Sequence, residues 1–515
     1  MSDGPGPTAL GPLDNAAALF VDAPMAEGYG DRPALVTPSG VVSYAGLRRL
    51  TDRAGHALRA LGVEPEQRVA ILLPDGPAWV AVFFAALKLG AVAVPLNTRL
   101  AGADLRTVLA DCRPKALIVA APLLAAAGAA LDGLGIPAVL DFDALVSAAP
   151  ETPLGPEPVG PDAMAFWLYT SGTTGSPKAA VHCHRTLPAC RFYGLDVLGA
   201  TPADRVFATS KLFFAYALGN ALLIPLLARA TSYLHSEWPD PAAIARVLRE
   251  FRPTLFFSVP TVYARVLRAD LPAQAFGSAR LCVSAGERLP AEIYHAWRER
   301  FGVEILDGIG ATETIFMMLS NRPGRSRAGS SGVPVPGTEV RILDGQGQSV
   351  PDGEQGVLWV RTPSQAAGYW KRLDHSRRTF VGEGFRTGDV YRRDPDGGHV
   401  HCGREDDFFK VAGQWVAPAE VESVLLRHPG VLDGGVVGAE EAGGLIKPFV
   451  FVVARDPQAE PEVLRADVRR FLEGALPPHQ RPREIQIVSE LPRTATGKLQ
   501  RFRLRDLARG PMVTP

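Results

Sequence analysis

The chain has 515 residues, 47% of them hydrophobic and 21% charged, as in an ordinary soluble globular protein. Its length exceeds what one hydrophobic core usually organises, so we expect two or more domains. The 54 basic and 54 acidic residues balance, which gives no electrostatic reason to expect nucleic acid or an anionic membrane as a partner.

Helical and strand-like patterns alternate along the first third of the chain. Residues 44–61 have helical spacing, residues 68–73 indicate an apolar strand, and residues 78–89 are helical again. Further short strands are expected at 92–95, 116–119, 138–140 and 165–169. This alternation is typical of an α/β fold in which helices are layered on largely parallel sheets.

The pattern changes after about residue 330. Residues 340–343 and 356–360 indicate short antiparallel strands between Gly/Asp turns. In the last part of the chain, predicted helices and strands fall at 420–426, 434–437, 449–453 and 461–472. We therefore expect a large N-terminal α/β domain and a small α+β C-terminal domain.

The cysteines and the apolar stretches bear on location. The five cysteines are scattered and include no C-x-x-C pair, so neither a disulfide framework nor a zinc site is predicted, and a cytoplasmic location is favoured. The N-terminus lacks the basic start and apolar core of a signal peptide. Lys88, Gly90 and Pro95 interrupt the most apolar stretch, 79–96, which we interpret as a buried helix and strand and not as a membrane span.

The densest motif is YTSGTTGSPK, residues 169–178, which follows an apolar strand. Its glycines allow a phosphate to approach the backbone, its hydroxyl and N–H groups donate hydrogen bonds, and Lys178 adds positive charge. It is not a Walker A loop, because Ala179 stands where that loop has a magnesium-binding hydroxyl. The alternative is a flexible Ser/Gly/Thr turn.

Five further motifs follow in order. They are SAGERLP (284–290), DGIGATE (307–313), FRTGDVYRRD (385–394), GREDDFFKVAGQWVAPAEVE (403–422) and PRTATGKLQR (492–501). Over nearly the whole chain the sequence resembles the adenylate-forming superfamily of acyl- and aryl-CoA ligases, luciferases and peptide-synthetase adenylation domains. The resemblance implies an N-terminal domain of residues 1–404 that includes a small β-barrel-like part. It also implies a mobile C-terminal domain of residues 405–515 that swings on Asp406.

The resemblance also assigns roles to residues for binding ATP, Mg²⁺ and CoA. Lys498, Thr312 and Glu313 would be catalytic, with Glu313 as the Mg²⁺ ligand. The ATP-binding residues would be Thr170, Ser171, Gly172, Thr173, Thr174, Gly175, Lys178, Ala285, Gly286, Glu287, Asp307, Gly308, Ile309, Thr312, Asp389, Arg404 and Lys498. Gly413, Gln414 and Trp415 would line the CoA tunnel. The alternatives are structural: DGIGATE as a glycine turn with a helix cap, Asp389 as a turn residue, and a simple β-hairpin around Gly413.

The segment KLFFAYALGN, residues 211–220, resembles the benzoate-CoA ligase branch. By resemblance the acid would contact Phe214, Ala215, Tyr216, Gly308, Gly310, Ile315 and Phe316, whose aromatic and glycine surfaces suit a flat ring. The alternative is that Phe213, Phe214 and Tyr216 are core aromatics. No acidic residue occurs from Val206 to Asn220, which argues against a free α-amino acid as substrate.

Two departures from the branch affect the choice of acid. Phe316 stands where benzoate ligases usually carry histidine, and Ala311 replaces the usual Ser or Thr. We expect a benzoate-type acid (benzoate, 2-aminobenzoate or a hydroxybenzoate), with an ortho-substituted ring turned over at least as well as benzoate.

The acceptor and the oligomeric state are less constrained by the sequence. No Asp-Ser phosphopantetheine site occurs in the chain, so CoA is the expected acceptor. Alternatives are an adenylating enzyme that loads a separate carrier protein and a catalytically silent nucleotide-binding relative. A homodimer is left open.

Overall fold

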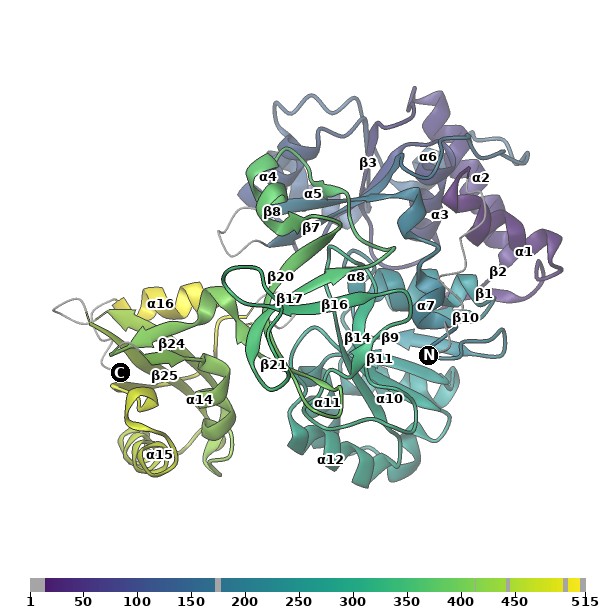
Figure 1. Cartoon of the computed structure of the whole chain (residues 1–515). Helices are drawn as coiled ribbons and strands as arrows, with labels where there is room; N and C mark the ends of the chain where they lie inside the picture. The colour runs from purple at the N-terminus through teal and green to yellow at the C-terminus, as the bar shows by residue number, and fades with distance from the viewer. Residues whose placement is uncertain (1–13, 172–176, 413, 441–444, 494–498, 510–515) are drawn as a thin grey trace, which may run out of the picture. The chain divides into compact units, whose positions relative to one another are not determined.

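The computed structural model describes residues 14–171, 177–412, 414–440, 445–493 and 499–509. The chain divides into two compact units (Figure 1). The larger unit comprises Met1–Val340 and Val360–Phe385, and the smaller comprises Arg341–Trp359 and Arg386–Pro515. The predicted boundary after residue 404 separates the N-terminal domain from a mobile C-terminal domain, and it stays a prediction.

The first large sheet has the strand order β15-β14-β13-β12-β11-β9-β10-β1-β2. Its strands are β1 (Pro33–Thr37), β2 (Gly40–Ser43), β9 (Arg205–Ala208), β10 (Thr231–Tyr233), β11 (Leu255–Ser258), β12 (Leu281–Ser284), β13 (Ile305–Gly310), β14 (Met317–Ser320) and β15 (Val333–Pro334). From β1 through β13 the neighbours are parallel, and β2, β14 and β15 add antiparallel edges.

The second large sheet has the order β18-β8-β7-β4-β3-β5-β6. Its strands are β3 (Arg68–Leu72), β4 (Val92–Pro95), β5 (Ala116–Val119), β6 (Ala138–Leu140), β7 (Met164–Ser171), β8 (Pro177–Cys183) and β18 (Gly368–Tyr369). The strands from β6 to β7 pair in parallel, whereas β8 and β18 are antiparallel. The prediction of α/β layers with largely parallel sheets is confirmed.

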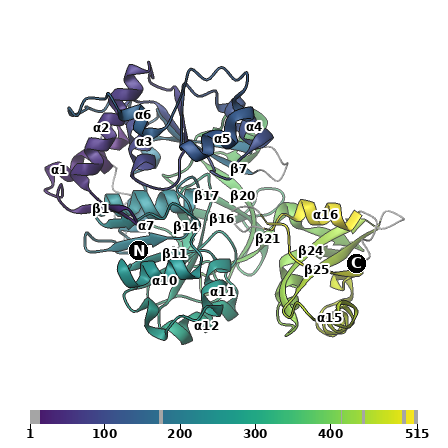
Figure 2. The same cartoon turned by 180° about the vertical axis from the view of Figure 1, so that it is seen from behind.

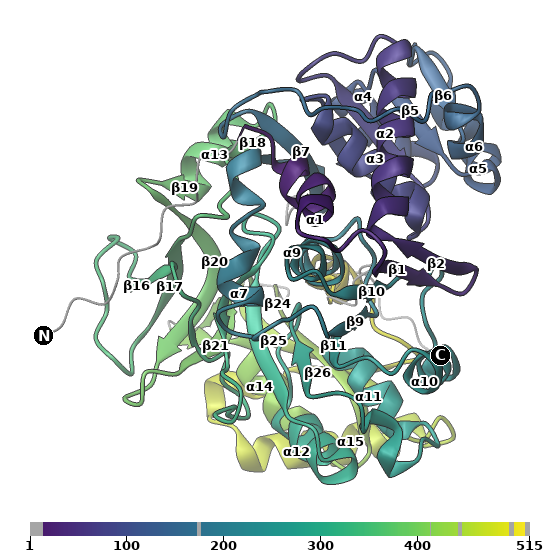
Figure 3. The ribbon, with the colours of Figure 1, turned by 90° about the vertical axis from the view of Figure 1, so that its right-hand side faces the viewer.

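Helices cover both faces of these sheets (Figure 3). Helices α2 (Tyr44–Ala60), α3 (Pro77–Lys88), α7 (Cys190–Gly194) and α9 (Ile224–Leu227) share one core with strands of both sheets. The outer faces are covered by α10 (Pro241–Glu250), α11 (Pro260–Arg268) and α12 (Ala291–Phe301) on the first sheet and by α4 (Gly102–Cys112) and α5 (Ala121–Leu131) on the second. Shorter helical segments of this unit are η1 (Ala18–Asp22), α1 (Ala23–Ala26), α6 (Phe142–Val146), η2 (His184–Thr186), α8 (Ala215–Ala217), η3 (Leu218–Leu223), η4 (Ala273–Phe276) and α13 (Leu373–Thr379).

The apolar stretch 79–96 is the interior helix α3 followed by β4, as predicted. The Lys88 ammonium within it is fully buried and lies 2.7 Å from both Asp22 Oδ1 and Asp52 Oδ1. Paired carboxylates and hydrogen bonds compensate the cost of burying that charge. No helix in the described part of the chain has the length and apolar character that crossing a bilayer demands.

The smaller unit contains the sheet β24-β25-β26, whose faces carry different helices (Figure 2). Helices α14 (Pro418–Leu425) and α15 (Pro461–Ala475) pack on the Val436 and Val450 face, and α16 (Arg501–Arg509) packs on the Val437 and Phe451 face. The strands are β24 (Val431–Glu440), β25 (Ile446–Ala454) and β26 (Glu484–Val488), and η6 (Pro478–Gln480) precedes β26. The expected α+β unit is confirmed.

The remaining strands form two small sheets. One has the order β16-β17-β20-β19, with β21 paired to β20, and the other is the hairpin β22-β23. Their bounds are β16 (Glu339–Leu343), β17 (Gln355–Arg361), β19 (Phe380–Val381), β20 (Gly384–Arg393), β21 (His399–Arg404), β22 (Phe409–Val411) and β23 (Gln414–Val416). The single-turn helix η5 (Glu405–Asp407) follows β21.

Candidate active site

The glycine-rich motif joins two antiparallel strands of the larger unit. Strand β7 ends at Ser171, β8 begins at Pro177, and Thr170 lies directly opposite Lys178. The register therefore holds two of the predicted phosphate contacts on one face of the hairpin. The predicted contacts Gly172, Thr173, Thr174 and Gly175 lie outside the described residues.

Thr312 and Glu313 are held against this hairpin by side chains from β8 and β18. His182 Nε2 donates to the Thr312 carbonyl oxygen at 2.8 Å, and burial lowers the pKa of His182 to about 4, so the ring is neutral near pH 7. The Tyr369 hydroxyl donates to Glu313 Oε1 at 2.5 Å, and its ring centroid lies 4.7 Å from Lys178 Nζ. The structure thus brings Lys178, Thr312 and Glu313 together.

The predicted adenine segments lie at the carboxyl ends of β12 and β13. Ser284 pairs with Asp307, so Ala285, Gly286 and Glu287 follow β12 where Asp307, Gly308 and Ile309 continue β13. Crevices at the carboxyl ends of parallel strands are the usual ligand sites of open α/β sheets. Asp307 is 5% exposed, and burial raises the pKa of its carboxyl to about 8.

Gly308 and Gly310 are required by the neighbouring strand β14. A Cβ at Gly308 would lie 2.6 Å from the Leu319 carbonyl oxygen, and one at Gly310 would lie 2.7 Å from the Phe316 carbonyl oxygen. Both glycines therefore have a structural reason independent of any ligand. Their role as walls of an acid pocket stays a prediction.

The segment Phe214–Asn220 meets Ile315 and Phe316. A Cβ at Gly219 would lie only 2.9 Å from Phe316 Cδ1, which shows how closely the helix approaches the ring. Ile315 has φ +60°, and the Phe316 N–H donates to the Thr314 carbonyl oxygen at 2.5 Å, closing a tight three-residue turn. A β-branched residue in this region is strained, and such strain concentrates at functional sites.

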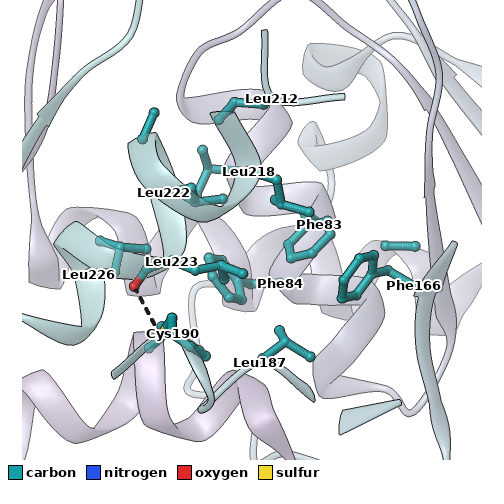
Figure 4. Close-up of a cluster of buried hydrophobic side chains, with 14 of the residues drawn as sticks. Phe83, Phe84, Phe166, Leu187, Cys190, Leu212, Leu218, Leu222, Leu223 and Leu226 are labelled. Carbon is teal, nitrogen blue, oxygen red and sulfur yellow. Dashed lines mark hydrogen bonds between the residues drawn. The ribbon is translucent and has the colours of Figure 1, made fainter. Parts of the chain in front are cut away.

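The aromatic residues of the segment have different environments. Phe213 is buried, whereas Phe214 and Tyr216 are partly exposed. The Tyr216 hydroxyl lies 3.0 Å from the carbonyl oxygens of both Ser258 and Val283. The leucines around them, including Leu212, Leu218 and Leu222, point into the central core (Figure 4). The core interpretation therefore holds for Phe213, and the predicted contacts with the acid remain open for Phe214, Ala215 and Tyr216.

A buried pair fixes the start of this segment. The Leu212 N–H donates to Asp75 Oδ1 at 3.1 Å, and Lys211 Nζ lies 4.0 Å from Asp75 Oδ2. Lys211 also donates to the carbonyl oxygens of His235 and Glu237. Burial raises the pKa of Asp75 to about 7 despite the nearby ammonium. These contacts tie the residues before Phe214 to the loop after β3.

In the smaller unit, Asp389 and Arg404 face each other across the β20-β21 hairpin. They are register partners, and Arg404 Nη1 donates to Asp389 Oδ1 at 3.0 Å and to the Thr387 carbonyl oxygen at 3.1 Å. Gly388 has φ +74°, and a Cβ there would lie 3.0 Å from Arg404 Nη2. Asp389 and Arg404 are thus a preformed pair.

Of the other predicted residues of the smaller unit, the structure describes Asp406, Gln414 and Trp415. Asp406 lies in η5, and Gln414 and Trp415 begin β23 of an antiparallel hairpin whose Lys410 ammonium is 4.7 Å from the Trp415 ring. Gly413 and Lys498 lie outside the described residues. On either side of residues 494–498, Arg493 pairs with Asp433 at 2.8 Å and Arg501 with Glu422 at 2.7 Å.

Comparison with known proteins assigns the family. The model of the AMP-binding enzyme matches residues 23–370, and that of the AMP-binding enzyme C-terminal domain matches residues 420–498. The chain belongs to the AMP-binding enzyme family. It is 40% identical to 3-hydroxybenzoate–CoA ligase of Aromatoleum sp. (strain CIB), covering 96% of this chain and 97% of that one.

Two solved structures of CoA ligases are similar to this chain, in agreement with the family assignment. A benzoate CoA ligase from Burkholderia xenovorans LB400 superposes with a TM-score of 0.88 at 41% identity, covering 96% of this chain and 100% of that one. The anthranilate CoA ligase AuaEII, solved with anthranoyl-AMP, also gives a TM-score of 0.88, at 38% identity and 96% coverage of both chains.

In this AMP-binding enzyme, the sequence motifs do not reveal Tyr369, His182 or the pair of Asp75 with Lys211. Tyr369 is 56 residues from Glu313 in sequence, and Asp75 is 137 residues from its backbone partner Leu212. Hydrophobic periodicity reports local spacing, so it cannot predict contacts between residues this far apart in sequence. For Tyr369, the only local signal in the sequence is the dipeptide Gly368-Tyr369 after an irregular segment. For Asp75, the only local signal is a lone aspartate before Gly76.

Proposed function

We propose that the chain is an aryl-CoA ligase that activates a benzoate-type acid with ATP and transfers the acyl group to CoA. The acid carboxylate would attack the α-phosphate of ATP, giving an acyl-adenylate and pyrophosphate, and the CoA thiol would then displace AMP. The proposal is supported by the family membership, by relatives named for benzoate, 3-hydroxybenzoate and anthranilate, and by the meeting of Lys178, Thr312 and Glu313.

The adenylation half would draw on the larger unit. The Lys178 ammonium and the Thr312 hydroxyl would bind phosphate oxygens, and Asp307 with Ala285–Glu287 would hold the adenine. Since a negative carboxylate approaches a negative phosphate, positive charge and donors at that point lower the barrier. Lys498, on the smaller unit, would add a further positive charge near the α-phosphate.

Mg²⁺ fits the residues around Glu313. The Glu313 carboxylate accepts a hydrogen bond from a neutral phenol and is partly exposed, so its negative charge is not cancelled by that partner. Mg²⁺ in nucleotide sites commonly uses one or two carboxylates together with substrate phosphates and water. When bound, the ion would neutralise charge on the phosphates.

The smaller unit would provide the ribose contacts and the CoA tunnel. Asp389 and Arg404 form a pair of acceptor and donor groups suited to a vicinal diol. Gly413, Gln414 and Trp415 would border the thiol tunnel, and Asp406 would be the hinge at the start of a mobile domain of residues 405–515.

The acid pocket would lie between Phe214–Tyr216 and the Gly308–Phe316 segment. Its closely packed aromatic and glycine surfaces suit a flat ring. Phe316 offers no hydrogen-bond donor to the acid, so an ortho-amino or ortho-hydroxyl group that bonds to its own carboxylate would be favoured.

One experiment tests the function and its rivals. Pyrophosphate release should be measured with benzoate, 2-aminobenzoate, hydroxybenzoates, fatty acids and amino acids, each with and without CoA. We expect release with benzoate-type acids and formation of their CoA thioesters. Adenylation followed by loading of a carrier protein but no CoA thioester would identify a carrier-loading enzyme, and no release with any acid would identify a silent relative.

A further inference from the structure

Tyr369 contacts two oppositely charged residues of the candidate phosphate site. Its hydroxyl donates to Glu313 Oε1 at 2.5 Å, and its ring centroid is 4.7 Å from Lys178 Nζ. The Glu313 carboxylate and the Lys178 ammonium carry opposite charges, and both contact this one phenol. No direct pair joins Lys178 to Glu313, both of which lie in the described part of the chain, and the phenol lies against each of them.

The position of Tyr369 is fixed by its backbone and by its neighbours. Strand β18 pairs with β8 so that Tyr369 lies opposite Ala180, two residues after Lys178. The Tyr369 N–H donates to Ser376 Oγ at 2.9 Å, and the Phe380 ring meets the phenol edge-on at 5.4 Å between centroids. Tyr369 is only 7% exposed, so its side chain has little freedom to move away from its charged partners.

The backbone of the same connection also holds Glu313. The Ala366 N–H donates to the Glu313 carbonyl oxygen at 2.8 Å. Ala180, Ala366 and Tyr369 form one small apolar cluster. The segment 366–369 therefore fixes both the backbone and the carboxylate of Glu313 relative to the strand that carries Lys178.

Two fully buried tyrosines of the larger unit, Tyr44 and Tyr263, donate to backbone carbonyl oxygens. Tyr44, for example, is 1% exposed and donates to the Ala230 carbonyl oxygen at 2.7 Å. Tyr369 differs because its hydroxyl donates to the partly exposed carboxylate of Glu313 and its ring contacts the ammonium of Lys178. A hydrogen bond to a charged group contributes more to stability than one between neutral groups. A cation–π contact also becomes stronger when it is partly shielded from water.

We propose that Tyr369 is a positioning residue that orients Glu313 for a divalent cation and Lys178 for the ATP phosphates while preventing the two from pairing with each other. The inference rests on the proposed function, since it concerns how the phosphate-binding and cation-binding residues of that same site are positioned. The hydroxyl orients the Glu313 carboxylate, and the ring orients the Lys178 ammonium. The two contributions are therefore separable by substitution.

Tyr369→Phe keeps the ring and removes the donor, whereas Tyr369→Leu removes both. For Tyr369→Phe we expect the Mg²⁺ concentration for half-maximal pyrophosphate release to rise about fivefold or more, with little change in KM for ATP at saturating Mg²⁺. For Tyr369→Leu both quantities should rise, because Lys178 also loses its support.

A binding measurement separates this role from turnover. Calorimetric titration with α,β-methylene-ATP over a series of Mg²⁺ concentrations should show the same displaced Mg²⁺ dependence in Tyr369→Phe. Tyr44→Phe is the matched control, because it removes one buried phenolic donor elsewhere in the larger unit. It should leave the Mg²⁺ dependence at its wild-type value, even if thermal unfolding shows a lower Tm.

The outcomes distinguish the inference from the proposed function. Wild-type Mg²⁺ dependence in Tyr369→Phe, with only a lower Tm, would reduce the residue to a structural role and overturn the inference. A lower Mg²⁺ requirement would also overturn it, since the hydroxyl would then obstruct the cation. A wild-type protein that binds Mg²⁺ and the analogue but activates no acid would refute the proposed function alone. If it binds neither, both are refuted.

Discussion

Glu313 in the larger unit and Asp389 in the smaller are both candidate nucleotide-binding carboxylates, but their partners differ. Glu313 accepts from the neutral Tyr369 hydroxyl, whereas Asp389 accepts from the Arg404 guanidinium. A carboxylate that binds a cation must keep its negative charge, so a neutral donor is suitable. A carboxylate that binds the uncharged hydroxyls of a ribose can be neutralised, and the guanidinium fixes its orientation. With the roles proposed here, the neutral partner suits a cation at Glu313 and the charged partner suits an uncharged diol at Asp389.

Lys498→Ala would test whether a positive charge from outside these two sites makes the largest contribution to the rate of adenylation, the first half-reaction. We expect adenylation to fall about 100- to 1000-fold, as for loss of one preorganised transition-state donor. Thioester formation from pre-made aryl-AMP should be much less affected. Single-turnover assays of the two halves would measure this, and an equal loss in both halves of a well-folded variant would contradict the idea of separate conformations.

Replacing each carboxylate by its amide would test the comparison directly. Glu313→Gln removes the negative charge needed for a cation, so kcat/KM for ATP should fall about 100-fold or more. Asp389→Asn keeps one acceptor oxygen for the ribose, and a loss of about tenfold is expected. Steady-state kinetics at saturating Mg²⁺ would decide, and equal losses would mean that the two sites do not differ in ligand charge.

Asp307 extends the comparison to a buried acid for which the described residues provide no ion pair, although the more distant Arg288 partly offsets the effect of burial on its pKa. Burial raises its pKa to about 8, so between about pH 4 and pH 8 the unfolded chain releases this proton while the folded chain retains it. Stability should therefore decrease with rising pH across that window, by at most about 1.4 kcal/mol per pH unit. Asp307→Asn should show a flatter dependence of unfolding free energy on pH from 5 to 8. Parallel wild-type and variant curves would show that Asp307 ionises normally.

Phe316→His tests the smallest effect, in the acid pocket. The variant restores a hydrogen-bond donor, so preference should shift from 2-aminobenzoate towards benzoate by a few-fold, because one hydrogen bond contributes only about 1 kcal/mol net. The measurement is kcat/KM for benzoate, 2-aminobenzoate and 4-hydroxybenzoate in both proteins. A wild-type preference for plain benzoate that the substitution leaves unchanged would refute the assignment.

Local patterns in the sequence predict most of the fold. Helix α2 and strands β5 and β6 fall within one residue of their expected bounds, because amphipathic spacing and short apolar runs are local signals. The motifs also predict that Lys178, Thr312 and Glu313 belong to one site. The supports of that site, Tyr369 and His182, could not be predicted, because they act through contacts distant in sequence. The same holds for Asp75, which fixes the start of the segment from Leu212 onward. Only the packing of sheets and loops creates such contacts.

The close approach of Gly219 to Phe316 has a consequence for changing the substrate range. A methyl group at Gly219 would lie 2.9 Å from the Phe316 ring and 3.3 Å from the Ile315 carbonyl oxygen. The two positions are therefore not independent, and the effect of a side chain at 219 will depend on the residue at 316. With phenylalanine at 316, a larger residue at 219 requires the ring or the backbone of Ile315 to shift. Libraries that randomise both positions together would sample larger residues at 219 directly with smaller residues at 316.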